Sequence, residues 1–159
     1  MIQNNCCLNI VLYEPEIPQN TGNIARTCAA VGAGLHLIKP LGFSVDDRYL
    51  KRAGLDYWDK LDVSYYENYN ELIETHEDAD FCYFTTKGKR NYCDMIYPKG
   101  CFIVFGKETA GLPQVILDAN PEKCFRIPMK KGIRSLNLSN SVAIVVFEIM
   151  RQQGFDGLL

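Results

Sequence analysis

The stretch that decides the fold is Ile133-Arg134-Ser135-Leu136-Asn137-Leu138-Ser139-Asn140-Ser141, which leads directly into the apolar run of residues 142–147. Side chains such as those of Asn137 and Ser139 accept hydrogen bonds from the free N–H groups of a first helical turn. The pattern therefore predicts that a polar loop ends here and a buried helix begins. The helix is expected to continue to about Gln152.

This C-terminal helix is apolar on two sides. One side carries, at spacings of three and four residues, Leu138, Val142, Val145, Val146 and Ile149. The opposite side carries Ala143, Ile144, Phe147 and Met150. A helix of this kind is buried on both sides. It either lies at the centre of its own chain or contacts the sheet with one side and a second molecule with the other, and the second arrangement points to a dimer.

The composition predicts a single globular domain over residues 1–159. A chain of 159 residues buries roughly 70% of its unfolded surface, which suffices for a hydrophobic core. No apolar run approaches the roughly 18 residues that a membrane span requires. The first residues also lack the basic and apolar regions of a signal peptide. We therefore expect a cytoplasmic protein.

The seven cysteines and two histidines do not form the pattern of a metal site or a catalytic triad. No C-x-x-C pair occurs, so we expect no disulfide framework, no zinc site and no bound metal. Cys82, Cys101 and Cys124 lie in strand-like runs and are expected to be core residues. His36 lies in an apolar run and His76 in an acidic segment, so neither resembles a general base beside a nucleophile.

The net charge of −2 does not by itself indicate a protein that binds nucleic acid. Basic side chains are nevertheless grouped along the chain. The groups are Arg48, Lys51 and Arg52; Lys87, Lys89 and Arg90; and Lys130, Lys131 and Arg134. After folding they either form one RNA-binding surface or remain separate solvated faces.

Short apolar runs alternate with helical segments. Strands are expected at residues 8–13, 35–38, 62–65, 81–85, 101–105 and 124–127. A first helix is expected to start at Asn20 or Thr21, which would cap it, and to end at Gly32 and Gly34. Further helices are expected at residues 46–53 and 70–77. The alternation predicts an α/β fold with a mainly parallel sheet and helices on both faces.

In open α/β sheets ligands bind beyond the carboxyl ends of the strands, so the loops after Thr85, Phe105 and Ile127 form the candidate site. The second loop contains Gly106 and Gly111, which either let a ligand approach the backbone or supply turn geometry. No Walker A sequence and no G-x-G-x-x-G opening a helix are present. From these loops and the basic groups alone, a small-nucleotide enzyme and a noncatalytic RNA-binding module both remain open.

Three ordered segments, residues 20–26, 105–113 and 127–140, together resemble the three motifs of the SpoU branch of the SPOUT RNA 2′-O-methyltransferases. Residues 8–18 and 52–57 are similar to its minimal subgroup, the TrmL (YibK) type, which acts on the tRNA wobble nucleotide. The resemblance covers nearly the whole chain. The departures from the family pattern are Lys107, Ala110 and Lys131-Gly132-Ile133.

The resemblance implies a deep C-terminal trefoil knot, S-adenosyl-L-methionine as methyl donor, and S-adenosyl-L-homocysteine as product, with no metal. It also implies a homodimer through the knot region, including the C-terminal helix. The substrate it implies is cytidine 34 or 5-carboxymethylaminomethyluridine 34 of leucine tRNAs, the alternative being another tRNA or rRNA position. Cofactor-binding residues carried over from the family are Phe84, Gly106, Ile127, Met129, Ser135, Leu136 and Leu138. We expect a side chain at Gly106 to enter the space of the cofactor.

The catalytic residues carried over from the family are Arg26, Asn23, Glu108 and Asn137. A guanidinium stays protonated, so Arg26 suits an oxyanion clamp better than a base, and in the related dimers this arginine reaches the site of the other subunit. Asn23 is expected to hold Arg26 or the ribose, Glu108 to brace the second motif, and Asn137 to orient substrate or loop. The alternative for Asn23, Glu108 and Asn137 is that each side chain only forms hydrogen bonds with free backbone groups of its own chain.

Overall fold

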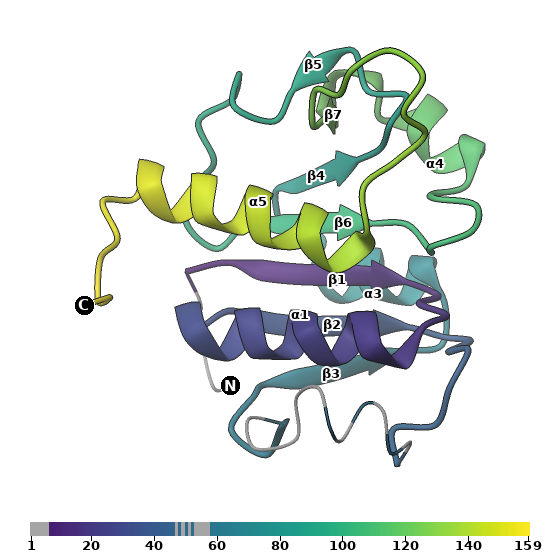
Figure 1. Ribbon diagram of the computed structural model, residues 1–159, viewed down its shortest axis with the longest axis vertical. Coiled ribbons are helices and arrows are strands. Elements are labelled where there is room, and N and C mark those ends of the chain that lie inside the picture. Colours follow the sequence, from purple (N-terminus) through teal and green to yellow (C-terminus); the bar gives the residue numbers. More distant parts are fainter. Residues whose placement is uncertain (1–6, 47, 49, 51, 53–57) are drawn as a thin grey trace.

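The computed structural model of the chain describes residues 7–46, 48, 50, 52 and 58–159. These residues form a seven-stranded sheet in the order β3-β2-β1-β6-β4-β7-β5 (Figure 1). Its strands are β1 (Asn9–Tyr13), β2 (Gly34–Ile38), β3 (Val63–Tyr66), β4 (Phe81–Phe84), β5 (Arg90–Asn91), β6 (Phe102–Phe105) and β7 (Cys124–Arg126). Each pair of neighbouring strands is parallel.

Helices cover both faces of this sheet, and each face has its own hydrophobic cluster. Helices α1 (Pro18–Val31) and α5 (Leu138–Gln152) pack on one face, where Ile24 and Val146 meet Ile103 of β6. Helices α3 (Tyr69–Thr75) and α4 (Gln114–Ala119) lie on the other, where Leu72 and Ile116 join Val104. Alternate residues of the strands therefore serve opposite clusters. The expected mainly parallel α/β fold is confirmed.

Helix α1 begins earlier than the sequence indicates. We expected Asn20 or Thr21 to cap it, but the helix starts at Pro18, and both residues lie buried inside its first turn. Proline suits the first helical position because its fixed φ matches the helix and its missing N–H would have had no partner there. The C-terminal end is as predicted, since Gly32 ends the helix with a positive φ of 71°.

Helix α5 is capped by Asn137, whose Oδ1 accepts a hydrogen bond from the Ser139 N–H at 2.9 Å. Met150, which we assigned to the outer side, is only 3% exposed and belongs to the core. Ile144 and Phe147 remain 37% and 46% exposed. The described chain therefore does not wrap this helix on all sides.

The six expected strands are present, with ends within one residue of the expected positions. Helix α3 starts one residue before its expected position, and Asn68 caps it. Strand β5, helix α4 and the 3-10 helix η1 (Pro121–Lys123) were not expected, because segments this short show no periodic pattern. The helix expected at residues 46–53 lies partly outside the described residues.

The cysteines that we assigned to the core are buried, since Cys82 and Cys101 are each 1% exposed and Cys124 is 7% exposed. They pack as small apolar residues within the strands or just before them. Among the described residues, no helix combines the length and the hydropathy needed to span a bilayer.

Candidate active site

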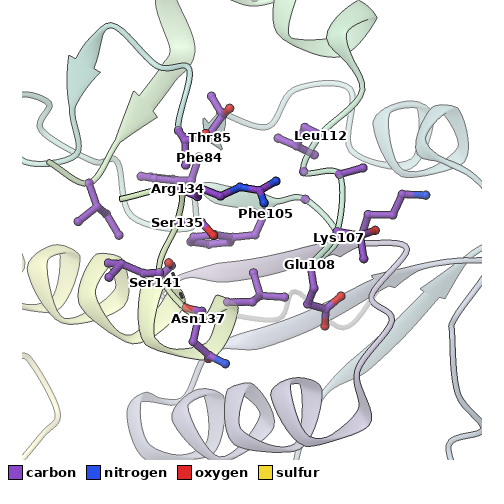
Figure 2. A pocket seen from close by; sticks show the side chains of 18 of the residues that line it. Phe84, Thr85, Phe105, Lys107, Glu108, Leu112, Arg134, Ser135, Asn137 and Ser141 are labelled. Atoms are coloured by element: carbon purple, nitrogen blue, oxygen red, sulfur yellow. Dashed lines mark hydrogen bonds between the residues drawn. The ribbon is translucent and has the colours of Figure 1, made fainter. Parts of the chain in front are cut away.

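A pocket of about 510 Å³ lies beyond the carboxyl ends of β4, β6 and β7. The three loops that follow Phe84, Phe105 and Arg126 contribute to its lining, as the sequence predicts for a parallel sheet. The first turns of α1 and α5 close its remaining side through residues such as Asn20 and Asn137. Segments distant in the sequence thus meet at one edge of the sheet (Figure 2).

Each of the residues that the family resemblance assigns to the cofactor lines this pocket. They are Phe84, Gly106, Ile127, Met129, Ser135, Leu136 and Leu138. Phe84 stacks on Phe105 with ring centroids 5.0 Å apart and an interplanar angle of 15°. The pocket thus combines an aromatic wall with polar groups, among them the Ser135 and Thr85 side chains. Such a lining suits a flat heterocycle with a few polar groups.

The loop after β6 is tied to the segment between β1 and α1 by three consecutive residues. Lys107 Nζ lies 3.0 Å from Glu14 Oε2. Glu108 accepts hydrogen bonds from the backbone N–H groups of Glu16 at 2.8 Å and Ile17 at 3.0 Å. Thr109 donates its backbone N–H and its hydroxyl to the Glu16 carboxylate. The loop is therefore held in position by side chains and not only by its own turn.

A chain of polar contacts, which we call the pocket network, joins Glu108, Asn20 and Asn137. Asn20 Nδ2 donates to Glu108 Oε1 at 3.2 Å, and Asn137 Nδ2 donates to Asn20 Oδ1 at 3.0 Å. Asn20 is only 6% exposed. The network connects the loop after β6, helix α1 and helix α5, and Figure 2 shows Glu108 and Asn137 pointing toward α1.

Sequence reasoning missed the position of Asn20, which it treated as a helix cap. A polar residue inside the first turn of an otherwise buried helix face is the signal that would have found it, because a buried amide needs partners from another segment. Those partners are Glu108 and Asn137.

A side chain at Gly106 would meet the backbone of its own loop, which corrects our expectation that it would enter the space of the cofactor. A Cβ atom at Gly106 would lie 2.1 Å from the carbonyl carbon of Gly111 and 2.2 Å from the backbone nitrogen of Leu112. Lys107 and Gly111 pair across this turn, and Gly111 has a φ of +67°. A side chain at Gly106 would therefore force the turn open before it reached any ligand.

Asn23 and Arg26 are not brought to the pocket of their own chain. Both side chains are exposed on α1, and neither residue lines the cavity. Glu108 and Asn137, the other two candidates, do line it. The roles of Asn23 and Arg26 therefore stay predictions that depend on a second copy of the chain.

The two histidines lie outside the pocket, in a second set of contacts that we call the histidine network. Asn9 donates Nδ2–H to the Gly100 carbonyl at 3.0 Å, which leaves its Oδ1 to accept from His36 Nε2 at 3.0 Å. His36 Nδ1 then accepts from the Tyr66 hydroxyl, whose oxygen accepts from His76 Nε2, each at 2.9 Å. Every donor in this chain thus has an acceptor when both rings are neutral.

The neutral state of these rings follows from where they lie. Burial, with a smaller contribution from the charge of His76, lowers the pKa of His36 to about 4. Burial also lowers the pKa of His76. Neither histidine is placed to exchange a proton with a ligand in the pocket.

The fold and the pocket together define a class of protein. A pocket at the carboxyl edge of a parallel sheet, with an aromatic wall and convergent polar groups, is where α/β proteins of this kind bind small molecules. A model of the SpoU rRNA methylase family matches residues 7–147, and the chain belongs to this family.

Relatives and solved structures agree with this membership. A Listeria monocytogenes protein is 56% identical over 154 residues, covering 95% of this chain and 91% of that protein. The tRNA (cytidine(34)-2′-O)-methyltransferase of Escherichia coli K12 is 50% identical over 151 residues, covering 94% and 96%. A structure described as concerning 2-OH methylation of C/U34 on tRNA superposes with a TM-score of 0.90 at 40% identity, covering 95% and 99%.

Proposed function

We propose that the chain is an S-adenosylmethionine-dependent tRNA methyltransferase that acts on the 2′-hydroxyl of the wobble ribose. The observation that carries the proposal is the meeting of three motif segments around one pocket at the carboxyl edge of the sheet. The substrate is inferred from the Escherichia coli relative, named for cytidine 34, and from the structure that concerns C/U34. Cytidine or 5-carboxymethylaminomethyluridine of leucine tRNAs is the proposed target, in the cytoplasm.

The pocket fits this cofactor in size and chemistry. Its volume of about 510 Å³ lies within the range of roughly 300–1,000 Å³ that small-molecule sites occupy. Phe84, Ile127 and Leu138 would pack against the adenine, and Ser135 would supply a hydrogen bond. When bound, S-adenosylmethionine supplies an electrophilic methyl group on a sulfonium.

The residues of the chain act by positioning. Glu108 and Asn20 hold the loop after β6 against α1, and Asn137 fixes the start of α5. A wall held in this way would keep a bound ribose and a bound cofactor aligned, which is the main requirement of a displacement without a covalent intermediate. Arg26 is proposed to stabilise the oxyanion that develops on the ribose.

A knot and a homodimer belong to the same proposal. Helix α5 follows β7, near one edge of the sheet, yet packs against α1, which lies over β2. The chain must therefore turn back across the sheet, as a trefoil knot requires. The exposed apolar residues Ile144 and Phe147 would be covered by a second copy of α5. The dimer would also bring Arg26 of one protomer to the pocket of its partner.

The test of the activity is transfer of a labelled methyl group from S-adenosylmethionine to total tRNA, followed by mapping of the modified nucleotide. We expect 2′-O-methylation at the wobble position. Methylation mapped to another tRNA or rRNA position would correct the substrate. RNA binding without methyl transfer would favour a noncatalytic RNA-binding module instead.

The shared site is tested by mixing two defective chains. Arg26→Ala should nearly abolish methyl transfer yet bind S-adenosylhomocysteine, whereas Ser135→Trp should fill the pocket of its own chain. Heterodimers then contain one site with an intact pocket and an intact arginine. They should regain up to about half of the wild-type activity per dimer if sites act independently. Subunit exchange verified by mass spectrometry without recovery would contradict an arginine acting across the interface.

A further inference from the structure

Arg134 lies in the pocket and has no partner in the part of the chain that the structure describes. It precedes Ser135 in the loop between β7 and α5, and it lines the cavity. Figure 2 shows its side chain extending across the pocket, with the guanidinium above Phe105 and Ser135 and directed toward Leu112. No hydrogen bond or ion pair joins this guanidinium to any described residue.

The other charged side chains of the pocket differ from Arg134 in this respect. Lys107 is paired with Glu14 at 3.0 Å, and Lys87 Nζ donates to Gln114 Oε1 at 3.0 Å. The Glu108 carboxylate is occupied by N–H groups of the segment before α1. Among the described charged residues of the pocket, Arg134 is thus the one whose donors are all left to a ligand.

We propose that Arg134 is the oxyanion-binding residue of this pocket, where its guanidinium forms a two-point hydrogen-bonded pair with a carboxylate or phosphate of a bound ligand. A guanidinium presents parallel N–H donors in a planar fork, and this fork matches the two oxygens of such a group. The inference rests on the proposed function, because that function supplies two oxyanions. They are the carboxylate of the cofactor and the phosphodiester beside the target ribose.

The position of the residue explains why an arginine suits this loop. Residues 130–137 are exposed, and Gly132 has a φ of +93° that lets the chain turn before Arg134. A side chain on such a loop must span the open part of the cavity to reach a ligand. The length of arginine allows this while its backbone stays at the rim.

The first experiment separates the cofactor from the RNA. Calorimetry with S-adenosylhomocysteine and with 5′-methylthioadenosine, which lacks the amino-acid carboxylate, is carried out on wild type, Arg134→Met and Arg134→Lys. If the carboxylate is the ligand group, Arg134→Met weakens S-adenosylhomocysteine by about 10- to 100-fold and leaves methylthioadenosine unchanged. Arg134→Lys recovers part of the loss, because it restores the charge without the fork.

The second experiment replaces single phosphates of an anticodon stem-loop. A methylphosphonate beside the wobble nucleotide removes one negative charge. If the phosphate is the ligand group, this replacement slows wild-type methyl transfer about 10- to 100-fold but adds little to the defect of Arg134→Met. In that case wild type and Arg134→Met bind S-adenosylhomocysteine with equal affinity. Either pattern supports the proposal and identifies the source of the oxyanion.

Lys131→Met is the matched control, since Lys131 is an exposed cation of the same loop that does not line the pocket. It should leave both cofactor affinities unchanged and show no coupling to the methylphosphonate. The proposal is overturned by two results together. Arg134→Met binds S-adenosylhomocysteine and methylthioadenosine as tightly as wild type does, and a methylphosphonate on either side of the wobble nucleotide slows methyl transfer by the same factor in Arg134→Met as in wild type. Failure of the proposed function looks different, because then the wild-type protein neither binds S-adenosylhomocysteine nor methylates tRNA.

Discussion

The pocket network and the histidine network are both polar clusters that join separate segments of the chain, yet they use different chemistry. In the pocket network the Glu108 carboxylate only accepts hydrogen bonds, from two backbone N–H groups and one amide. In the histidine network His36 is donor and acceptor at once and His76 donates to the Tyr66 hydroxyl, so the contacts depend on a single protonation state of each ring. The first network lines the pocket, and the second lies away from it.

This difference shows that the residue type best known for catalysis does not identify the site here. His36 and His76 connect β2 and the end of α3 through Tyr66 of β3, which makes them part of the packing of one sheet face. Glu108 and Asn20 connect separate segments that converge on a ligand cavity. The position of a side chain at the carboxyl edge of the sheet therefore indicates a role in ligand binding more directly than the reactivity of its chemical group does.

Replacing Glu108 tests the pocket network most severely. In Glu108→Ala the N–H groups of Glu16 and Ile17 and the Asn20 amide lose their acceptor. Hydrogen bonds to a charged acceptor are stronger than neutral ones, so the free energy of unfolding should fall by about 3 kcal/mol. Methyl transfer should fall by at least about 100-fold, because small displacements of a positioning wall are costly. Denaturant unfolding and single-turnover rates measure the two effects.

The neighbouring residue provides the control. Thr109→Val removes an exposed hydroxyl contact to Glu16 but leaves the backbone N–H bond to the same carboxylate. Its stability and rate should stay close to wild type. Equal losses in the two variants would mean that the loop is sensitive to any change, and the special place of Glu108 would be refuted.

The histidine network should make the free energy of unfolding depend on pH. Because His36 has a pKa of about 4 in the folded chain and about 6.5 when unfolded, the unfolded state binds more protons between these values. Stability is therefore fully present above about pH 6.5 and falls as the pH drops to 4, by about 3 kcal/mol. Urea unfolding between pH 7.5 and 4.5 measures this slope.

His36→Gln places a neutral amide, which can both donate and accept a hydrogen bond, where the titrating ring was. Carboxylates titrate in both proteins, so the difference between the two slopes isolates His36. We expect the variant to lose less stability on acidification than wild type. Identical slopes would show that the ring protonates as readily in the folded chain as in the unfolded chain.

Much of this architecture could be predicted from the sequence. Apolar runs located the six expected strands to within one residue, and the capping pattern gave Asn137 or Ser139 as the start of α5, of which Asn137 is the observed cap. Strand β5 and helix α4 could not be predicted, since elements this short are fixed by tertiary contacts and not by periodicity.

The candidate site also has a part that could be predicted from the sequence and a part that could not. The pocket-lining positions of Phe84 and Ile127 could be predicted, because ligands bind at strand ends and the family motifs mark these residues. The contacts of Glu108 with Asn20 could not be derived, because they join residues separated by 88 positions. The clash that explains Gly106 depends on how closely Gly111 approaches, which only the folded turn determines.

The smallest effect is expected where the pocket network ends, at Asn137. Its Oδ1 caps α5 by accepting from the N–H of Ser139, while its Nδ2 donates to Asn20. Serine is also a good N-cap, so Asn137→Ser keeps the cap and removes the link to Asn20, at a cost of about 1 kcal/mol. Asn137→Ala removes both and should cost about 2 kcal/mol. Denaturant unfolding of the two variants and of Asn20→Ala separates the contributions in a double-mutant cycle. If Asn137→Ser in the Asn20→Ala background costs as much as it does in wild type, the amide pair adds nothing, and the pocket network ends at Asn20.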